Sequence, residues 1–344
     1  MAVTLKDVAK AAGVSPMAVS KALHGAGSNV RVSPDTIEHI RRVAQQLNYR
    51  PNVLARSLRL RQTHCIGVVF ENFPELIGDI AYYNELLTGI MRAAFPKRFS
   101  VTLCNQLIGE FSENALADGR FDGLIWCRDT PGDELESTAK RIGLPIVVLH
   151  ETREATGTSA HVGWDNANAS AALADHLFAL GHRRAGFFLP HRSGNNPEAR
   201  ERMDGFFRRW KLLGGEVRDT DWLAWPDNAE GFAEWWDARP DQTALVGWNE
   251  LCAIELLRTA ERHRVSVPAQ LSIVGFDSTP KCNTTLPPLT AVRQPLVDMG
   301  QAATNLLIQR ITDPESAPVR LVFPGTLDVR ASTARPPLDE EISS

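Results

Sequence analysis

The sequence predicts an α/β protein in which a short all-helical segment precedes a large body built on parallel sheets. Two observations lead to this fold class. The first 62 residues carry a formal charge of +7 and the remainder carries −11, so the chain joins two segments of opposite charge. From residue 65 onward, short apolar runs alternate with helical stretches, as in parallel strands that are covered by helices. With 344 residues, the chain is long enough for two or three hydrophobic cores.

Start and stop signals define three helices within the first fifty residues. Each helix follows a polar side chain that can cap its first turn. These side chains are Thr4, Ser15 and Ser33. Asp7 completes a variant of the capping box, and Gly13 ends the first helix. The second helix starts at Pro16 and is expected to end near Leu23, and the third is expected to end near Asn48.

Two short helices that are joined by a tight turn and braced by a third make a helix-turn-helix, whose second helix can lie in the major groove of DNA. The side chains of this region expected to face inward are Val14, Val19 and Leu23, and those expected to point outward are Met17, Ala18, Ser20 and Lys21. Lys21 could donate to guanine and Ser20 to a phosphate or a base, while Met17 or Ala18 could touch a thymine methyl group. A three-helix bundle with a merely solvated basic surface is the alternative.

Two motifs in the N-terminal region carry a resemblance to a known family. They are TLKDVAKAAGVSPMAVSKAL at residues 4–23 and LNYRPNVLARSL at residues 47–58. With these motifs the chain resembles the lactose-repressor and galactose-repressor (LacI/GalR) family of bacterial transcription regulators. The resemblance implies a homodimer that binds double-stranded operator DNA. It places the DNA-readout positions at Pro16, Met17 and Lys21, with Ser15, Ala18 and Ser20 as further contacts, and two of the readout positions are apolar where several members are polar.

Residues 50–63 are expected to link the headpiece to the body. The helix-like core of this segment has about eight residues, which is too short for a stable isolated helix because nucleation is costly. In the family the segment forms a hinge helix that pairs with its dimer mate in the minor groove, where an apolar side chain wedges into the central base step. The resemblance assigns the wedge to Leu58 and implies further DNA contacts at Asn52, Ala55, Arg56 and Arg59. A flexible basic tether is the alternative.

The resemblance extends over the body, where GHRRAGF at residues 181–187 and PPLTAVRQP at residues 287–295 match the family. It implies a periplasmic-binding-protein-like body of two doubly wound parallel-sheet lobes. The expected domains are a helix-turn-helix headpiece at 1–49, the linker at 50–63 and an effector-binding and dimerisation domain at 64–344. Within this domain we expect lobe 1 at 64–164 and 293–324, lobe 2 at 165–292 and 325–335, and a tail at 336–344.

Aromatic and polar residues that follow the apolar runs are candidates for a ligand site, because ligands of open parallel sheets sit beyond the carboxyl ends of the strands. Tryptophan rings in such positions can stack on the C–H faces of a sugar. The candidates of this kind are Trp126, Trp164 and Trp248. Polar candidates close to the same strand ends are Asp165, Asn249 and Asp277. Each tryptophan taken alone is more typical of a hydrophobic core.

The family resemblance adds to this candidate site. Positions that contact effectors in sugar-responsive members fall on Arg202, Asn249, Asp277 and Asn168. Trp225 lies next to Pro226, where some relatives have an aromatic ring, and is a candidate substitute for it. Arg128, Arg202 and Lys281 together favour a sugar acid, although a single arginine near a strand end is as often part of a surface ion pair. The expected effector is therefore a sugar or a sugar acid that binds between the two lobes.

The sequence gives no support to catalysis. It lacks the G-x-S-x-G, P-loop, G-x-G-x-x-G and H-E-x-x-H motifs, its nine histidines form no evident metal pair, and its five scattered cysteines form no C-x-x-C pair. No enzyme activity, metal or cofactor is therefore expected. The pair His150-Glu151 comes closest to acid–base machinery, and the end of a strand explains it more simply.

These observations predict a sequence-specific transcriptional regulator, a repressor, whose operator affinity responds to the effector. A periplasmic-type sugar receptor without a DNA role is the alternative, and it predicts a signal peptide and no helix-turn-helix. The sequence shows neither a secretory signal nor a membrane span, so we expect a cytoplasmic protein. The tail RPPLDEEISS has no leucine heptad for a coiled-coil tetramer, so a dimer is expected.

Overall fold

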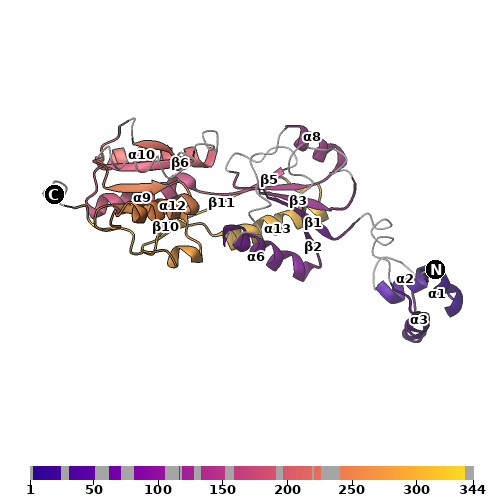
Figure 1. The fold of residues 1–344 in the computed structure, drawn as a ribbon. Coiled ribbons are helices and arrows are strands. Elements are labelled where there is room, and N and C mark those ends of the chain that lie inside the picture. Colours follow the sequence, from indigo (N-terminus) through magenta and orange to yellow (C-terminus); the bar gives the residue numbers. More distant parts are fainter. Residues whose placement is uncertain are drawn as a thin grey trace. The chain divides into compact units, whose positions relative to one another are not determined.

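The chain divides into two compact units, Met1–Thr63 and His64–Ser344 (Figure 1). The computed structural model describes residues 3–24, 31–50, 62–70, 81–104, 116, 118–127, 133–151, 159–190, 197–218, 221–225 and 241–337. Among these residues, no helix combines the length and the apolar character that crossing a membrane requires.

The described residues of the first unit form three helices, α1 (Leu5–Ala12), α2 (Pro16–His24) and α3 (Pro34–Gln46), so the predicted helices are confirmed. A full capping box joins Thr4 to Asp7, and Gly13 ends α1 in the left-handed conformation with φ 66°. Ser15 Oγ accepts a hydrogen bond from the Ala18 N–H at 3.2 Å, and Ser33 Oγ accepts one from the Thr36 N–H at 3.2 Å. These side chains satisfy N–H groups that a helix start leaves unpaired.

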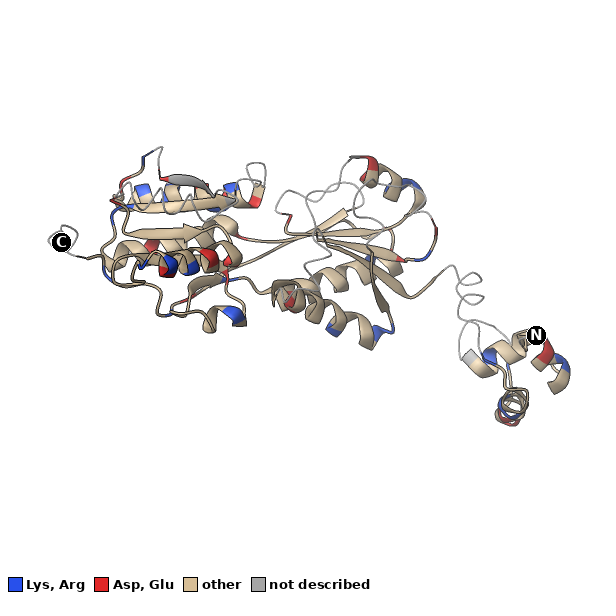
Figure 2. Ribbon diagram, in the orientation of Figure 1, with Lys and Arg blue, Asp and Glu red and all other residues tan. Residues whose placement is uncertain are grey.

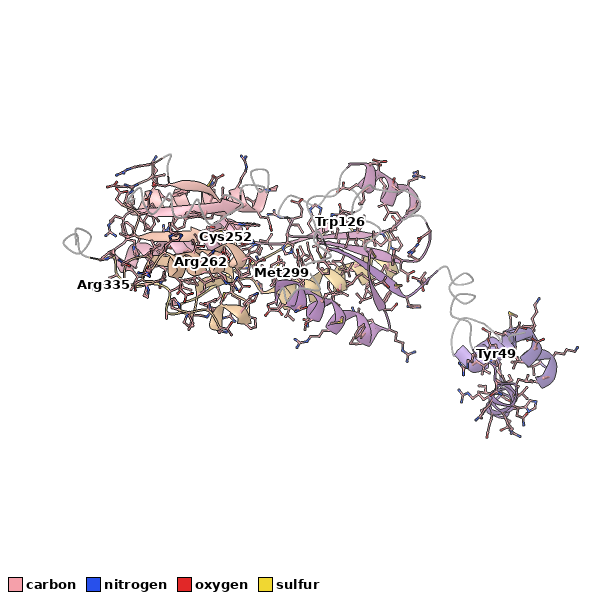
Figure 3. All side chains as sticks on the ribbon, in the orientation of Figure 1. Tyr49, Trp126, Cys252, Arg262, Met299 and Arg335 are labelled. Carbon is pink, nitrogen blue, oxygen red and sulfur yellow. The ribbon has the colours of Figure 1, made fainter. Side chains whose placement is uncertain are left out.

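The three helices share one small core. Val8 of α1, Val19 of α2 and Ile40 of α3 are each 0% exposed. Partly buried apolar side chains pack around this core, and they include Val14, Leu23 and, after α3, Tyr49 (Figure 3). The inward orientation predicted for Val14, Val19 and Leu23 is thus confirmed.

In the part of the second unit that the structure describes, the strands form two six-stranded sheets. The first sheet, which forms the first lobe, has the order β11-β5-β4-β3-β1-β2, and all its strand pairs are parallel. Its strands are β1 (Cys65–Phe70), β2 (Ser100–Leu103), β3 (Gly123–Cys127), β4 (Ile146–Leu149), β5 (Ser159–Trp164) and β11 (Arg320–Phe323). The helices of this lobe are α6 (Ala81–Ala94), the 3-10 helix η1 (Phe95–Lys97), α8 (Asp133–Ile142) and α13 (Leu296–Thr312).

Helices α6 and α13 lie side by side on one face of the first sheet, although about 200 residues separate them in the sequence (Figure 1). Two glycines permit this close approach. A Cβ atom on Gly89 of α6 would lie 2.1 Å from the Val297 carbonyl oxygen, and one on Gly300 of α13 would lie 2.5 Å from the Leu86 carbonyl oxygen. The backbones of the two helices are therefore in direct contact.

The second sheet forms the second lobe and has the order β12-β10-β9-β8-β6-β7, with β12 antiparallel to β10. Its strands are β6 (Ala185–Pro190), β7 (Trp222–Trp225), β8 (Ala244–Gly247), β9 (Ser272–Asp277), β10 (Thr290–Arg293) and β12 (Thr326–Asp328). Its helices are α9 (Asn166–Leu180), α10 (Pro197–Leu213), α12 (Glu250–Arg262) and the 3-10 helix η4 (Pro280–Asn283).

The chain passes three times between the two lobes. It leaves β5 for α9, returns from β10 to α13, and crosses again between β11 and β12. The predicted fold class, a helical headpiece followed by two parallel-sheet α/β lobes, is confirmed. The residue boundaries predicted for the headpiece, linker, lobes and tail stay predictions.

Candidate functional sites

The exposed surface of α2 carries the first candidate site. Met17 is 58% exposed, Ser15 and Pro16 are also exposed at the helix start, and Lys21 is half-buried one turn later. The solvent-exposed thioether of Met17 contributes little to a hydrophobic core. Both this side chain and the ammonium group of Lys21 can contact the edges of bases. The outward orientation predicted for Met17 is thus confirmed.

The outward orientation predicted for Ala18 and Ser20 is wrong. Ala18 is 8% exposed and Ser20 is 7% exposed. The reason is that α2 packs against both α1 and α3, so two neighbouring helices cover a wider arc of its surface than one would. Ala18 and Ser20 lie on this covered arc, and their contacts with DNA stay predictions.

Lysine and arginine positions occur along the helices of the first unit, coloured blue in Figure 2. The exposed ones among the described residues are Lys6, Lys10, Arg31, Arg41, Arg42 and Arg50. Such a surface attracts the phosphates of DNA without reading its sequence. The linker contacts predicted at Asn52, Ala55, Arg56, Leu58 and Arg59 lie outside the described residues.

The second candidate site centres on Arg202 of α10, which is 2% exposed. Its Nε donates to Asn166 Oδ1 at 2.9 Å, and its Nη1 donates to the Trp248 carbonyl oxygen at 2.8 Å. Its guanidinium carbon lies 5.0 Å from the ring centroid of Trp164 and 5.8 Å from that of Trp248. Rings at these distances stabilise the cation through their electron-rich faces.

Two carboxylates face the same guanidinium group. Asp277 Oδ1 lies 3.7 Å from Arg202 Nη1, and Glu198 Oε2 lies 4.0 Å from Nη2. The structure therefore brings together four of the predicted residues, namely Trp164, Arg202, Trp248 and Asp277. Glu198, one helical turn before Arg202 on α10, was not predicted, and its i,i+4 spacing is the signal that could have identified it.

The first lobe adds two side chains that sequence reasoning did not place in the site. The Tyr82 hydroxyl on α6 lies 2.8 Å from His150 Nε2, and His150 follows directly after β4 with φ 65°. His150 Nδ1 lies 3.8 Å from Glu198 Oε1, so the two lobes meet at this point. His150 had the right position for a site residue, at the end of an apolar run, whereas nothing in the sequence marks Tyr82. The interlobe cluster is defined here as Tyr82, His150, Trp164, Glu198, Arg202, Trp248 and Asp277.

Burial controls the ionisation of the first-lobe pair. Burial and, to a smaller extent, the nearby Arg202 charge lower the pKa of His150 to about 3, so the imidazole is neutral at physiological pH. Burial also raises the pKa of Tyr82 well above its usual value, and the Glu198 carboxylate adds to this effect. Both side chains are therefore uncharged hydrogen-bonding groups.

Asp277 and Asn249 are held by the first turn of α12. Asp277 Oδ2 accepts a hydrogen bond from the Glu250 N–H at 3.1 Å, and Asn249 Oδ1 accepts one from the Cys252 N–H at 2.8 Å. Asp277 Oδ1 also accepts from Gln294 Nε2 at 2.6 Å. The positive helix terminus thus fixes two of the predicted polar residues at the carboxyl ends of β8 and β9.

Other predicted residues lie apart from the interlobe cluster. Trp126, labelled in Figure 3, is 6% exposed and belongs to a hydrophobic core of the first lobe, and its assignment to a ligand site stays a prediction. Asp165 caps α9 by accepting a hydrogen bond from the N–H of Asn168, and Asn168 is exposed. Arg128 and the side chain of Trp225 lie outside the described residues. No group of three or more potential metal ligands occurs in the described part of the chain.

Comparisons with known proteins match both parts of the chain. Residues 4–52 match the family described as bacterial regulatory proteins, lacI family, and residues 174–333 match a periplasmic binding protein-like domain. The chain is 29% identical to the HTH-type transcriptional repressor PurR of Photobacterium profundum over 90% of this chain and 92% of that protein.

Two solved structures show the same fold. One is a complex of the transcriptional regulator CelR with cellobiose, at 25% identity and a TM-score of 0.70, covering 96% of this chain and 99% of that one. The other is a LacI family transcriptional regulator from Enterococcus faecium with bound ribose, at 25% identity and a TM-score of 0.69, covering 79% of this chain and 99% of that one.

Proposed function

The chain belongs to the LacI family of bacterial regulatory proteins, and we propose that it is a repressor whose operator affinity is set by a small carbohydrate bound at the interlobe cluster. As a member of this family it is a DNA-binding transcriptional regulator and not an enzyme. Its sugar, its operator specificity and its dimeric state are the parts that we propose.

The exposed face of α2 supports sequence-specific DNA binding. Met17 and Lys21 are one helical turn apart on the second helix of the helix-turn-helix, the element that enters the major groove in such motifs. We assign Lys21 to a guanine and Met17 to the methyl group of a thymine. The linker residues around Leu58 and the homodimer are carried over from the family resemblance.

The contact between the lobes is the observation that carries the effector proposal. His150 of the first lobe lies 3.8 Å from Glu198 of the second, and Trp248 offers a half-buried ring beside Arg202. A molecule bound here touches both lobes, so its affinity depends on the angle between them. Such a difference in affinity shifts the population of lobe arrangements, which is how the effector would control the headpiece. The cellobiose and ribose complexes of the two structural neighbours support a carbohydrate.

The test uses the full-length protein. Duplexes selected from fragmented genomic DNA should bind at least a thousandfold more tightly than random duplex at the same salt concentration, as is typical of specific regulators. Ribose, cellobiose and other neutral sugars are then added, and one of them should raise the melting temperature and change the affinity for the selected duplex. Equal affinity for selected and random duplex would contradict a regulatory role, and sugar binding without any DNA preference would favour a sugar receptor.

A further inference from the structure

The point at which the chain enters the body is fixed by several contacts. His64 is the first residue of the second unit and follows directly on the linker predicted at residues 50–63. Its N–H donates to Asp122 Oδ2 at 2.8 Å, and its carbonyl oxygen accepts from the Ser100 N–H at 2.8 Å and from Ser100 Oγ at 3.1 Å. Both backbone polar groups of His64 are therefore bound to other segments of the first lobe.

His64 has a left-handed backbone conformation, with φ 53°. Residues that carry a side chain rarely adopt it, and apart from glycine it is tolerated best by asparagine, aspartate and histidine. The His64 ring packs against Phe99, with 5.3 Å between the ring centroids, and Phe99 belongs to the core of the first lobe. An unfavourable backbone conformation persists only where the surrounding contacts hold it, and such residues gather at functional sites. At His64 the conformation changes the direction of the chain directly before β1.

The residues that hold His64 come from both sides of β1. In the first sheet, β1 lies between β2 and β3. Ser100 is the first residue of β2, and Asp122 directly precedes β3. The turn at His64 is thus attached to both neighbouring strands, so the direction in which the chain leaves β1 follows the orientation of the first sheet. A rotation of the first lobe relative to the second would turn the start of the linker by the same angle.

We propose that His64 is a positioning residue, held by Asp122, through which the first lobe sets the direction in which the linker leaves the body. This inference rests on the proposed function, because the direction matters only when the headpieces of a dimer must reach two half-sites at a fixed spacing.

The junction at His64 should affect specific DNA binding far more than nonspecific binding. If the junction were loose, its conformation would have to be ordered when the headpieces settle on an operator, and this ordering costs conformational entropy. Binding to random duplex depends on phosphate contacts, which any placement of the headpiece along the DNA can provide. The ratio of the two affinities therefore reports on the junction.

The experiment measures the dissociation constant for random duplex divided by that for the selected duplex, on the full-length protein at one salt concentration. His64→Val places a β-branched side chain at a positive φ, which such residues avoid, and it should lower this ratio about tenfold. His64→Gly and His64→Asn accept the left-handed conformation and should keep the ratio close to that of the unmodified protein. An unchanged ratio in His64→Val would overturn the inference. An equal loss in all three variants would also overturn it, because the ring and not the backbone conformation would then be responsible.

A second pair of variants tests the carboxylate that holds the junction. Asp122→Ala removes the acceptor of the His64 N–H and should also lower the ratio, whereas Asp118→Ala, which removes an exposed carboxylate paired with Arg120 in the same loop, should leave it unchanged. If His64→Val does not fold, Asp122→Ala decides in its place.

Two other results have distinct meanings. A purely structural role of Asp122 would lower the unfolding free energy of the body in Asp122→Ala and leave the ratio of dissociation constants unchanged, and this result would overturn the inference while the proposed function stands. Equal affinity of the unmodified protein for both duplexes would contradict the proposed function, and the inference would fail with it.

Discussion

The exposed face of α2 and the interlobe cluster hold the candidate site residues in opposite environments. Met17 stands 58% exposed, and nothing in the small headpiece core depends on it. Arg202 is 2% exposed and is tied to Asn166, Trp248, Glu198 and Asp277. The candidate side chains of α2 are therefore exposed to solvent, whereas those of the interlobe cluster are already held in place by contacts within the protein.

Because of this difference in burial, substitutions in the two regions should affect the stability of the free protein differently. Truncation of an exposed readout side chain removes contacts that exist only in the DNA complex, so the free protein should keep its stability. Truncation inside the interlobe cluster leaves buried partners without their hydrogen bonds or counter-charge, and this costs stability as well as ligand binding.

The largest effect is expected for Arg202→Ala. The change leaves Asp277 buried without its counter-charge and Asn166 without its donor, so we expect a loss of about 3 kcal/mol or more in the free energy of unfolding. The response of operator binding to the effector should disappear while operator binding itself remains. Denaturant unfolding and DNA binding with and without the sugar measure both effects.

The matched control for this variant is Arg208→Ala, an exposed arginine on the same helix, which should change the unfolding free energy by less than about 0.5 kcal/mol. Similar losses of unfolding free energy in Arg202→Ala and Arg208→Ala would show that the buried contacts of Arg202 do not stabilise the body. The proposed difference between α2 and the interlobe cluster would then be wrong.

A change in DNA sequence preference is expected for Lys21→Ala. Loss of its donor should cost about 1–3 kcal/mol of discrimination at one base position in each half-site, with little change in melting temperature. The measurement is a binding profile over a library of duplexes. Lys10→Ala on α1 is the control, because an exposed lysine outside α2 should weaken binding to all duplexes alike. A profile of Lys21→Ala identical to that of the unmodified protein would remove Lys21 from the readout.

Acid should destabilise the body through His182. This ring is 1% exposed, its nitrogens lie 2.7 Å from Thr243 Oγ1 and 2.9 Å from the Ala334 carbonyl oxygen, and burial lowers its pKa to about 4. The folded state therefore disfavours the protonated ring. Its stabilising effect is fully present above the unfolded pKa of about 6.5 and is lost as the pH falls toward 4, which amounts to about 2 kcal/mol at pH 5.

The measurement for His182 is the unfolding free energy of the body between pH 7 and pH 5. His182→Gln should remove the part of this pH dependence that His182 contributes, about 2 kcal/mol, and leave the part that the buried His150 contributes. His263→Gln, at an exposed position, should preserve the full pH dependence. An equally steep curve in His182→Gln would assign the acid sensitivity to other groups, of which His150 is the first to examine.

The smallest effect is expected at the start of α3. Ser33→Ala removes the side chain that accepts from the Thr36 N–H, and it should cost the headpiece about 1 kcal/mol. Ser33→Asp keeps an acceptor at the same position and should retain most of the stability. Thermal unfolding followed by circular dichroism measures both variants. A neutral Ser33→Ala would mean that water replaces the cap without cost.

The sequence predicted the local features of the headpiece well. The caps at Thr4, Ser15 and Ser33 and the stop at Gly13 depend on residues within one helical turn, so their signals are complete in the sequence. The same reasoning was wrong for Ala18 and Ser20, because the width of the buried arc of α2 depends on the number of helices that pack against it.

In the body, the alternation of apolar runs and helices was enough to predict parallel sheets, and strand ends were enough to select Trp164, Trp248 and Asp277. The interlobe cluster itself could not be predicted from the same rules. Tyr82 and Arg202 are 120 positions apart in the sequence, and only the three crossings between the lobes bring their elements together. Trp126 and Trp164 both met the strand-end criterion and both lie in hydrophobic cores, and only the tertiary structure shows that Trp164 lies beside Arg202.

The amino-acid sequence by itself determined the helix limits, the charge division and the fold class, because each of these depends on neighbouring residues or on simple periodicity. Only the tertiary structure decided which polar groups meet in the interlobe cluster. The charge of Arg202 follows from the sequence, but its hydrogen bonds to Asn166 and Trp248 and its contact with Asp277 come from residues far along the chain, so only the folded structure brings them to the guanidinium group.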